Sequence, residues 1–294
     1  MTVSHSTAFL TMADLGDFVS DDELAAAVLR ERGWAVDFVP WDAQRDWSVY
    51  DLVVIRTTWD YFQRPQAFIQ ALTAIERSTA VLHNDISLVR WNLDKGYLTD
   101  LQKAGVPVVP SRFATGLNSP AELAAHFLAF DSEAVILKPV INAGGFDTFL
   151  VPRAGYESFF TGLHAVFAER PYVAQPFMPA VQSEGEYSLI YLDGVFCHAI
   201  LKTPAAGDFR AQEEYGSHVV SISPSAPLLD TGRRAIDALD SAPLYARVDL
   251  VRADDGTFLI MEFELIEPSL YLRMDASAPE RFANALANAL TRSR

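Results

Sequence analysis

The chain has 294 residues, half of them hydrophobic and 21% charged, which is the balance of a folded protein of enzyme size rather than a disordered or fibrous one. Its formal net charge of −15 argues against nucleic acid as the main partner, because phosphate backbones bind clustered Lys and Arg, but it permits a small phosphate ligand. A single cysteine excludes an internal disulfide. Since residues 1–6 contain no basic leader and no apolar run approaches the roughly 20 residues of a spanning helix, we expect a cytoplasmic protein without a membrane partner.

The first part of the chain alternates strands and helices. This alternation predicts a parallel sheet with helices on both faces. Ser20 and Glu23 have the spacing of a capping box, which predicts a helix start there. No glycine-rich dinucleotide fingerprint follows the first strand, which counts against a nicotinamide enzyme. The expected strands cover 8–12, 35–39, 52–55 and 80–82, and the expected helices cover 21–32 and 65–76.

A polar and aromatic segment, 56–61, directly follows the third expected strand. Ligands of parallel sheets gather beyond the carboxyl ends of the strands. The segment could therefore hold a small zwitterion, and its candidate substrate residues are Arg56, Thr57, Thr58 and Asp60. A packed loop with a surface Arg explains the same pattern equally well.

The middle of the chain offers two lysines and a glycine loop. Lys95 falls on an expected helix over 93–104, and Lys138 ends an expected strand over 134–137. Gly144 and Gly145 would let backbone N–H groups approach a phosphate beside Lys138, although an ordinary hairpin turn fits too. The remaining expected elements are a short strand from 108, a helix over 120–130, a strand over 148–151, a helix reaching 170 and a strand over 172–175.

The last part of the chain reads as antiparallel strands. Asp193 and Gly194 lie between two apolar runs, which is a strong hairpin pattern. A second hairpin turns at 254–256. The expected strands cover 187–192, 195–202, 245–250 and 258–264, with helices over 231–240 and 279–290.

Three acidic residues lie inside the final hairpin. Glu262 and Glu264 are two residues apart and therefore project from the same face, and Asp249 would join them if it lies opposite. Oxygen ligands of this kind suit Mg²⁺. A solvated strand face is the alternative, but the apolar residues 259–261 and the nearby Arg247 favour a metal and phosphate site.

The order of these motifs resembles the ATP-grasp superfamily over nearly the whole chain, above all bacterial glutathione synthetase and D-alanine–D-alanine ligase. The resemblance implies an α/β fold, α+β in its C-terminal part. It divides the chain into a Rossmann-like domain with its linker (1–112), a small ATP-grasp subdomain with the glycine loop and hinge (113–178), and a large one with the metal hairpin (179–294). It also implies a ligase that phosphorylates a small amino-acid-like substrate and forms an amide-type C–N bond, releasing ADP and phosphate.

The resemblance also implies roles for single residues. Arg247, Arg210 and Lys138 would act in catalysis, and Asp249, Glu262 and Glu264 would hold two Mg²⁺ ions, with Mn²⁺ as an alternative. Substrate would meet Arg210, Ser269 and Tyr271 besides the 56–60 candidates. ATP would contact Lys95, Lys138, Gly144, Gly145, Gln175, Pro176, Phe177, Met178, Lys202 and one of Glu184 and Glu186, of which Glu186 matches better.

Two departures from the family pattern stand out. Glu264 replaces the usual Asn of the last metal motif, and Ser269 replaces a Gly after Pro268. Within the superfamily the chain is similar to cyclo-ligases of the D-cycloserine synthetase type, which close O-ureido-D-serine into a ring. A ligase that joins two amino acids or peptides, a phosphotransferase and a nucleotide-binding module without catalysis are the alternatives. A homodimer is the assembly expected by analogy.

Overall fold

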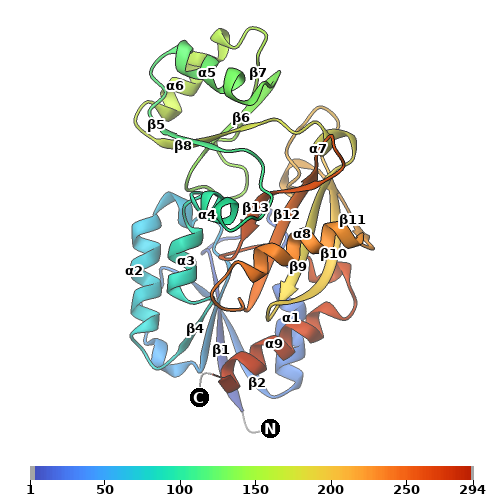
Figure 1. The fold of residues 1–294 in the computed structure, drawn as a ribbon. Helices are drawn as coiled ribbons and strands as arrows, with labels where there is room; N and C mark the ends of the chain where they lie inside the picture. The colour runs from blue at the N-terminus through green and yellow to red at the C-terminus, as the bar shows by residue number, and fades with distance from the viewer. Residues whose placement is uncertain (1–3, 293–294) are drawn as a thin grey trace.

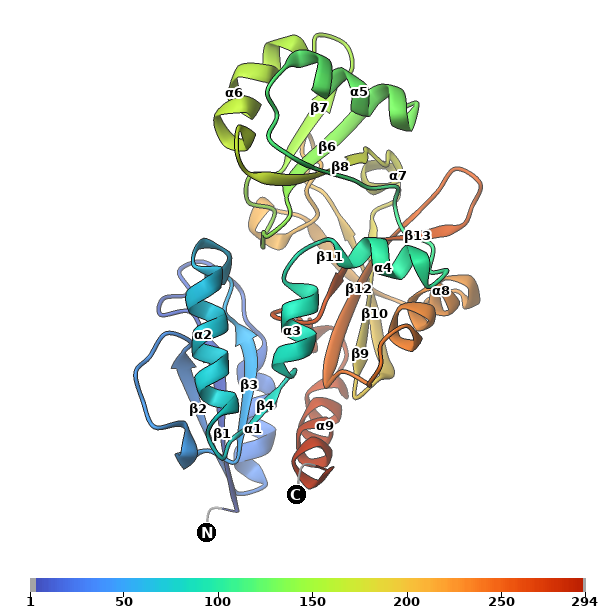
Figure 2. The same ribbon diagram turned by 60° about the vertical axis from the view of Figure 1, so that its left-hand side comes forward.

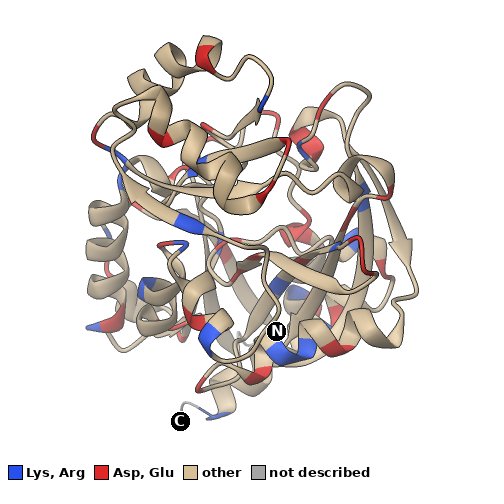
Figure 3. Cartoon of the chain, turned by 45° about the horizontal axis from the view of Figure 1, so that its top comes forward, with Lys and Arg blue, Asp and Glu red and all other residues tan. Residues whose placement is uncertain are grey.

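The computed structural model describes residues 4–292, which form three sheets and the helices that pack on them (Figure 1). The observation on a leader at 1–6 therefore lies partly outside the described residues. Charged residues of both signs occur in all three parts and in the strands at the centre (Figure 3). No helix within residues 4–292 is long and apolar enough to cross a membrane.

The N-terminal sheet is parallel, in the order β2-β1-β3-β4, as the strand and helix alternation predicts. One face packs on α2, and the other face shares a core with α1 and the C-terminal helix α9. The elements are β1 (His5–Thr11), α1 (Asp22–Glu31), β2 (Trp34–Pro40), β3 (Leu52–Thr57), α2 (Pro65–Glu76), β4 (Val81–His83) and α9 (Ala278–Arg292). Short 3-10 turns cover Trp47–Val49 and Tyr61–Gln63.

The small sheet projects away from the rest, and Figure 2 shows it as a separate lobe. It is antiparallel, in the order β5-β8-β6-β7, and two helices pack on it around a core of its own. Its elements are β5 (Arg112–Thr115), α5 (Pro120–Phe130), β6 (Ala134–Pro139), β7 (Phe149–Pro152), α6 (Glu157–Phe167) and β8 (Pro171–Pro176).

The large sheet is antiparallel, in the order β11-β10-β9-β12-β13, and carries both predicted hairpins. Helix α8 covers one face. The elements are α7 (Ala180–Ser183), β9 (Glu186–Leu192), β10 (Val195–Thr203), β11 (His218–Ile222), α8 (Ala226–Asp237), β12 (Tyr245–Arg252) and β13 (Phe258–Glu264), with 3-10 turns at Glu213–Tyr215 and Leu272–Met274.

The prediction that one helix covers 93–104 is wrong about where the helix begins. The chain instead forms α3 (Ile86–Asn92) and α4 (Tyr97–Lys103), and Lys95 lies on the turn between them. The Asp94 carboxylate accepts the N–H of Gly96 at 2.7 Å, and the N–H of Lys95 donates to the Val140 carbonyl at 2.9 Å. These bonds compete with helical hydrogen bonding.

Two other helix starts also differ from the prediction. Helix α8 begins five residues before the predicted 231, at Ala226, with Pro227 in its first turn. Helix α1 begins after Asp21, whose side chain makes no capping hydrogen bond. Ser20 instead accepts the N–H of Asp22 at 3.3 Å, so no capping box forms.

Burial of His126 in α5 makes the small lobe sensitive to acid. Its Nε2 lies 3.0 Å from the Tyr172 hydroxyl, whereas its buried Nδ1 has no partner among the described residues. Burial lowers the pKa of His126 to about 4. Between about pH 6.5 and 4 the unfolded chain therefore binds a proton that the folded chain does not, and stability falls as the pH falls.

We expect His126→Gln to weaken this pH dependence. The wild-type free energy of unfolding should lose up to about 1.4 kcal/mol more per pH unit than the variant between pH 6 and 4. Urea unfolding at pH 7, 6 and 5 measures the difference. Parallel curves for the two proteins would contradict the assignment.

Candidate active site

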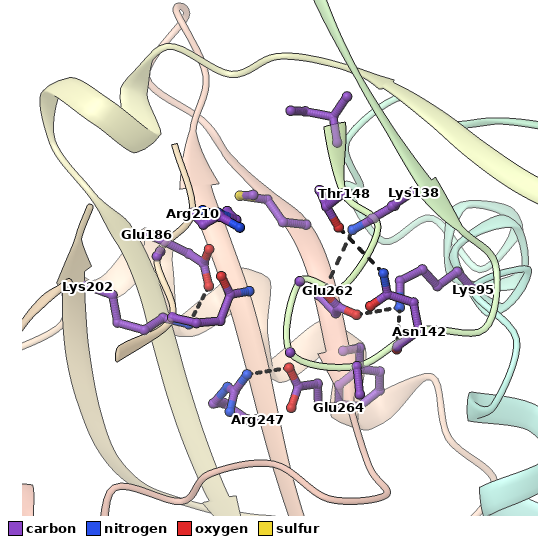
Figure 4. A pocket seen from close by; sticks show the side chains of 18 of the residues that line it. Lys95, Lys138, Asn142, Thr148, Glu186, Lys202, Arg210, Arg247, Glu262 and Glu264 are labelled. Atoms are coloured by element: carbon purple, nitrogen blue, oxygen red, sulfur yellow. Dashed lines mark hydrogen bonds and ion pairs between the residues drawn. The ribbon is translucent and has the colours of Figure 1, made fainter. Parts of the chain in front are cut away.

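A pocket lies between the N-terminal part, the small sheet and the large sheet, and it gathers most of the predicted site residues. Side chains from the α3–α4 turn, the small sheet and the large sheet all face it (Figure 4). The predicted residues that line it are Lys95, Lys138, Gly144, Gly145, Gln175, Pro176, Phe177, Met178, Glu186, Lys202, Arg210, Arg247, Glu262, Glu264, Ser269 and Tyr271. The other six do not line it, namely Arg56, Thr57, Thr58, Asp60, Glu184 and Asp249.

Two buried lysines converge on Glu262, one from the α3–α4 turn and one from the small sheet. The Lys95 Nζ lies 2.8 Å from one Glu262 carboxylate oxygen, and the Lys138 Nζ lies 3.7 Å from the other. Burial alone would raise the pKa of Glu262, but Lys95 and Lys138 lower it. Burial also lowers the pKa of Lys138, which Glu262 opposes. Two ammonium groups in a pocket can contact phosphate oxygens, as the sequence predicts for ATP.

The remaining acids of the hairpin face cations of the large sheet. The register places Asp249 opposite Glu262 and Arg247 opposite Glu264. Arg247 donates to both Asp249 oxygens at 3.0 and 3.1 Å and to Glu264. Lys202, 2% exposed, pairs with Glu186 and lies 3.4 Å from Asp249.

The donor set fits a divalent cation best at Glu262 and Glu264. Burial, aided by Asp249 and Glu262, raises the pKa of Glu264 to about 7 despite Arg247, so negative charge is under-neutralised there. Asp249 is held by Arg247, Lys202 and Ser188. Within residues 4–292 no group of three or more acidic, His or Cys side chains is arranged to hold a metal ion, so a metal role for Asp249 stays a prediction.

The glycine loop reaches across the pocket from the small sheet. Gly144 and Gly145 have φ of +58° and +68°, a left-handed backbone that favours glycine. The loop carbonyl of Gly144 accepts from the Tyr215 hydroxyl at 3.2 Å, and the Asn142 carbonyl accepts from Lys95 at 3.2 Å. The loop is thus held against Lys95 on one side and the 204–217 segment on the other.

The predicted hinge, residues 175–178, begins with the last two residues of β8 and continues along the pocket wall. Gln175 donates to the Ser111 hydroxyl at 2.9 Å, and the Phe177 N–H donates to the Ala134 carbonyl at 2.9 Å. The Phe177 N–H already donates to Ala134 and is not available to adenine. Neighbouring main-chain groups, such as the Met178 N–H, would have to make the adenine contacts.

The structure separates the two ribose candidates. Glu186 is buried, lines the pocket and pairs with Lys202. Glu184 instead accepts from Arg252 with both oxygens at 3.0 Å, outside the pocket. The geometry therefore favours Glu186 for the ribose hydroxyls.

Arg210 lies on the 204–217 segment over the pocket. Asp208 accepts from its guanidinium at 2.8 and 3.1 Å, and the guanidinium carbon lies 3.5 Å from the centre of the Tyr215 ring. These contacts hold the predicted substrate Arg in one orientation.

The substrate candidates of the 56–60 segment are directed elsewhere. Arg56, 2% exposed, pairs with Asp22 at 2.9 Å and stacks near Tyr245. Thr57 and Thr58 are buried, and Asp60 accepts from the Trp41 indole at 2.7 Å. Side chains at the end of a buried strand can join two domains instead of facing a ligand. Arg56 does so, because it donates to Asp22 in its own domain and to the Pro268 carbonyl next to the large sheet.

Other pocket residues were not singled out as site residues. Trp59 and Tyr61 are the aromatic residues of the 56–61 segment, which was expected to hold a zwitterion, and both line the pocket. Phe18 also comes from the N-terminal domain, and Glu267 comes from the segment after β13. Burial, reinforced by Glu264, raises the pKa of Glu267 to about 8. A signal existed for Glu267, which continues the acidic pattern of Glu262 and Glu264 within an apolar run before Pro268.

Comparison with known proteins agrees with this architecture. Residues 7–84 match the family model of the N-terminal domain of D-cycloserine synthetase DcsG, and residues 113–227 match the ATP-grasp domain of prokaryotic glutathione synthetase. The chain is 31% identical over 277 residues to the cycloserine biosynthesis protein DcsG of Streptomyces lavendulae, covering 89% of this chain and 91% of that protein.

Two further matches differ in how much of the chain they cover. The crystal structure of D-cycloserine synthetase DcsG superimposes with a TM-score of 0.85 and 28% identity, covering 97% of this chain and 99% of that one. Glutathione synthetase of Rhodopseudomonas palustris is 30% identical over 175 residues, which covers 58% of this chain and 51% of that protein.

The fold and the pocket define an ATP-grasp ligase, an enzyme that uses ATP and a divalent metal ion. Within this superfamily, the chain belongs to the family of the cycloserine biosynthesis protein DcsG.

Glu264→Asn tests the acidic metal position. We expect the variant to keep Mg-ATP binding, because an amide oxygen is still a donor and Arg247 keeps its pair with Asp249. Wild-type affinity for Mg²⁺ and nucleotide should weaken as pH falls below about 7, where Glu264 takes up a proton, and the variant should lack this dependence. Calorimetric titration with a non-hydrolysable ATP analogue at pH 6 and 8 measures both. Complete loss of nucleotide binding would show that the motif is misplaced.

Proposed function

We propose that the protein is an ATP-dependent cyclo-ligase that closes O-ureido-D-serine toward D-cycloserine, a step of antibiotic biosynthesis. The supporting observation is that similarity to DcsG includes the N-terminal domain as well as the ATP-binding part. That domain contributes Phe18, Trp59 and Tyr61 to the pocket. The glutathione synthetase match, by contrast, covers little more than half the chain.

The chemistry assigned to the pocket has two bond-forming steps. A substrate carboxylate oxygen attacks the γ-phosphorus of ATP and displaces ADP. The ureido nitrogen bonded to oxygen then attacks the acyl carbon, loses its proton, and phosphate leaves. The closed ring still carries the carbamoyl group, and its hydrolysis yields carbon dioxide and ammonia.

The chain's own residues serve these steps by position and charge. Lys95 and Lys138 would hold the phosphates, and the 142–145 loop would cover them. Arg247 lies beside Glu264, where it can contact the transferred phosphate and the developing oxyanion. Two Mg²⁺ ions, held through Glu262 and Glu264, would offset negative charge on the transferring phosphate.

The direct test is incubation with Mg-ATP and O-ureido-D-serine. We expect ADP, phosphate and cycloserine in equal amounts, detected by coupled assay and mass spectrometry. Pairs of amino acids, and γ-glutamylcysteine with glycine, are the comparison substrates for a two-substrate ligase. ADP release with such a pair and none with O-ureido-D-serine would overturn the proposal.

Glu262→Ala separates catalysis from mere nucleotide binding. The change leaves Lys95 and Lys138 without the carboxylate they share, and it removes a metal donor. We expect turnover to fall by about 100-fold or more, in the range seen when one electrostatic group of an active site is removed. Circular dichroism checks the fold, and Glu76→Ala, on the exposed side of α2, is the matched control. Undiminished turnover would contradict the metal assignment.

A further inference from the structure

Glu267 is a buried carboxyl group that faces the pocket without a cation of its own. It is 7% exposed and lines the pocket. The other buried acids of the site pair with Lys95, Lys138, Lys202 or Arg247, whereas no ion pair to Glu267 forms within residues 4–292. The Tyr61 hydroxyl borders the same pocket, and its interaction with Glu267 opposes the rise in the pKa of Glu267. A buried carboxyl group ionises readily only when a cation faces it.

The main chain around Glu267 is fixed by four side chains. Successive carbonyl oxygens of residues 266 to 269 each accept a hydrogen bond, which leaves the segment little freedom. The donors are Tyr245 to Ile266 at 2.9 Å, Trp59 to Glu267 at 2.9 Å, Arg56 to Pro268 at 3.0 Å and Arg247 to Ser269 at 3.2 Å. The main chain that carries Glu267 is therefore held in place before any ligand arrives.

Glu267 also borders the part of the pocket assigned to phosphoryl transfer. It lies three residues after Glu264 and lines the same pocket as Glu264, Lys95 and Arg247. In an α-amino acid the ammonium and carboxylate share one carbon, so a residue that binds the ammonium must lie beside the group that is phosphorylated. Glu267 meets this geometric requirement.

We propose that Glu267, oriented by Tyr61, binds the α-ammonium group of the substrate and so selects amino acids over simple carboxylic acids. The inference rests on the proposed function for the identity of the substrate. An ammonium supplies the cation that the carboxyl lacks, and the Trp59 and Phe18 rings, 5.1 Å apart between centroids, border the same pocket. Tyr61 acts as a positioning residue.

The test combines Glu267→Gln with a substrate that lacks the amine. O-Ureido-D-serine and 3-(ureidooxy)propanoate differ only in that group. We expect wild type to prefer the amino acid by about 10- to 100-fold in kcat/KM, the range for a hydrogen bond to a charged group. In Glu267→Gln the preference should shrink to within a few-fold, mainly through KM. Tyr61→Phe should reduce it partially.

The controls distinguish this role from others. Glu214→Gln removes an exposed carboxyl at the same pocket and should retain the wild-type preference. Binding of a non-hydrolysable Mg-ATP analogue to Glu267→Gln should match wild type, and a changed Mg²⁺ dependence would instead make Glu267 a metal ligand and overturn the inference. An unchanged preference for the amine in Glu267→Gln would also overturn it. If Glu267→Gln fails to fold, Tyr61→Phe provides the test. A preference for the amino acid in kcat/KM equal to that of wild type would then overturn the inference.

Failure of the proposed function has a different signature. It appears as wild-type protein that releases no ADP with O-ureido-D-serine. The inference is then tested by comparing D-alanine with propanoate as ligands of the wild-type protein in thermal unfolding. An equal rise in the unfolding temperature with the two ligands would contradict it.

Discussion

The site depends on carboxylates that stay charged away from water because cations from other elements face them. Lys95 comes from the α3–α4 turn and Lys138 from the small sheet, yet both meet Glu262 on the large sheet. Removing one partner of a buried pair costs about 3–5 kcal/mol. The contact between Lys138 and Glu262 therefore has two effects. It prepares a binding site, and it links the small lobe to the large sheet.

Besides lining part of the pocket, the N-terminal domain supports the main chain on which the site is built. Arg56 and Trp59 hold the carbonyls of Pro268 and Glu267, and Asn84 donates to the carbonyls of Tyr245 and Leu265. Helix α9 returns from the end of the chain to share a core with β1 and α1. The N-terminal sheet and the large sheet thus support each other across a continuous apolar core, and this junction shapes the substrate end of the pocket.

The sequence predicted the sheets and the nucleotide end of the pocket better than the substrate end. Hydrophobic periodicity and turn residues predicted most strands because those signals are local, and the final hairpin has the predicted turn. The break at Lys95 was missed because it depends on a bond from Lys95 to Val140, far along the chain. Arg56 was placed near substrate by a general rule for strand ends, which could not foresee its buried pair with Asp22. The cations facing the acidic hairpin come from four separate segments, so spacing alone could not assign their partners.

The small lobe enters and leaves the molecule at one place. Its first and last strands pair directly, with Arg112 opposite Ala174, and Gln175 of β8 donates a hydrogen bond to Ser111, the residue before β5. A segment with adjacent ends and its own apolar core has the anatomy of an inserted module. Such a module can open as a separate cooperative unit in hydrogen exchange. It could also be exchanged between relatives as a cassette without disturbing the core that the other two sheets share.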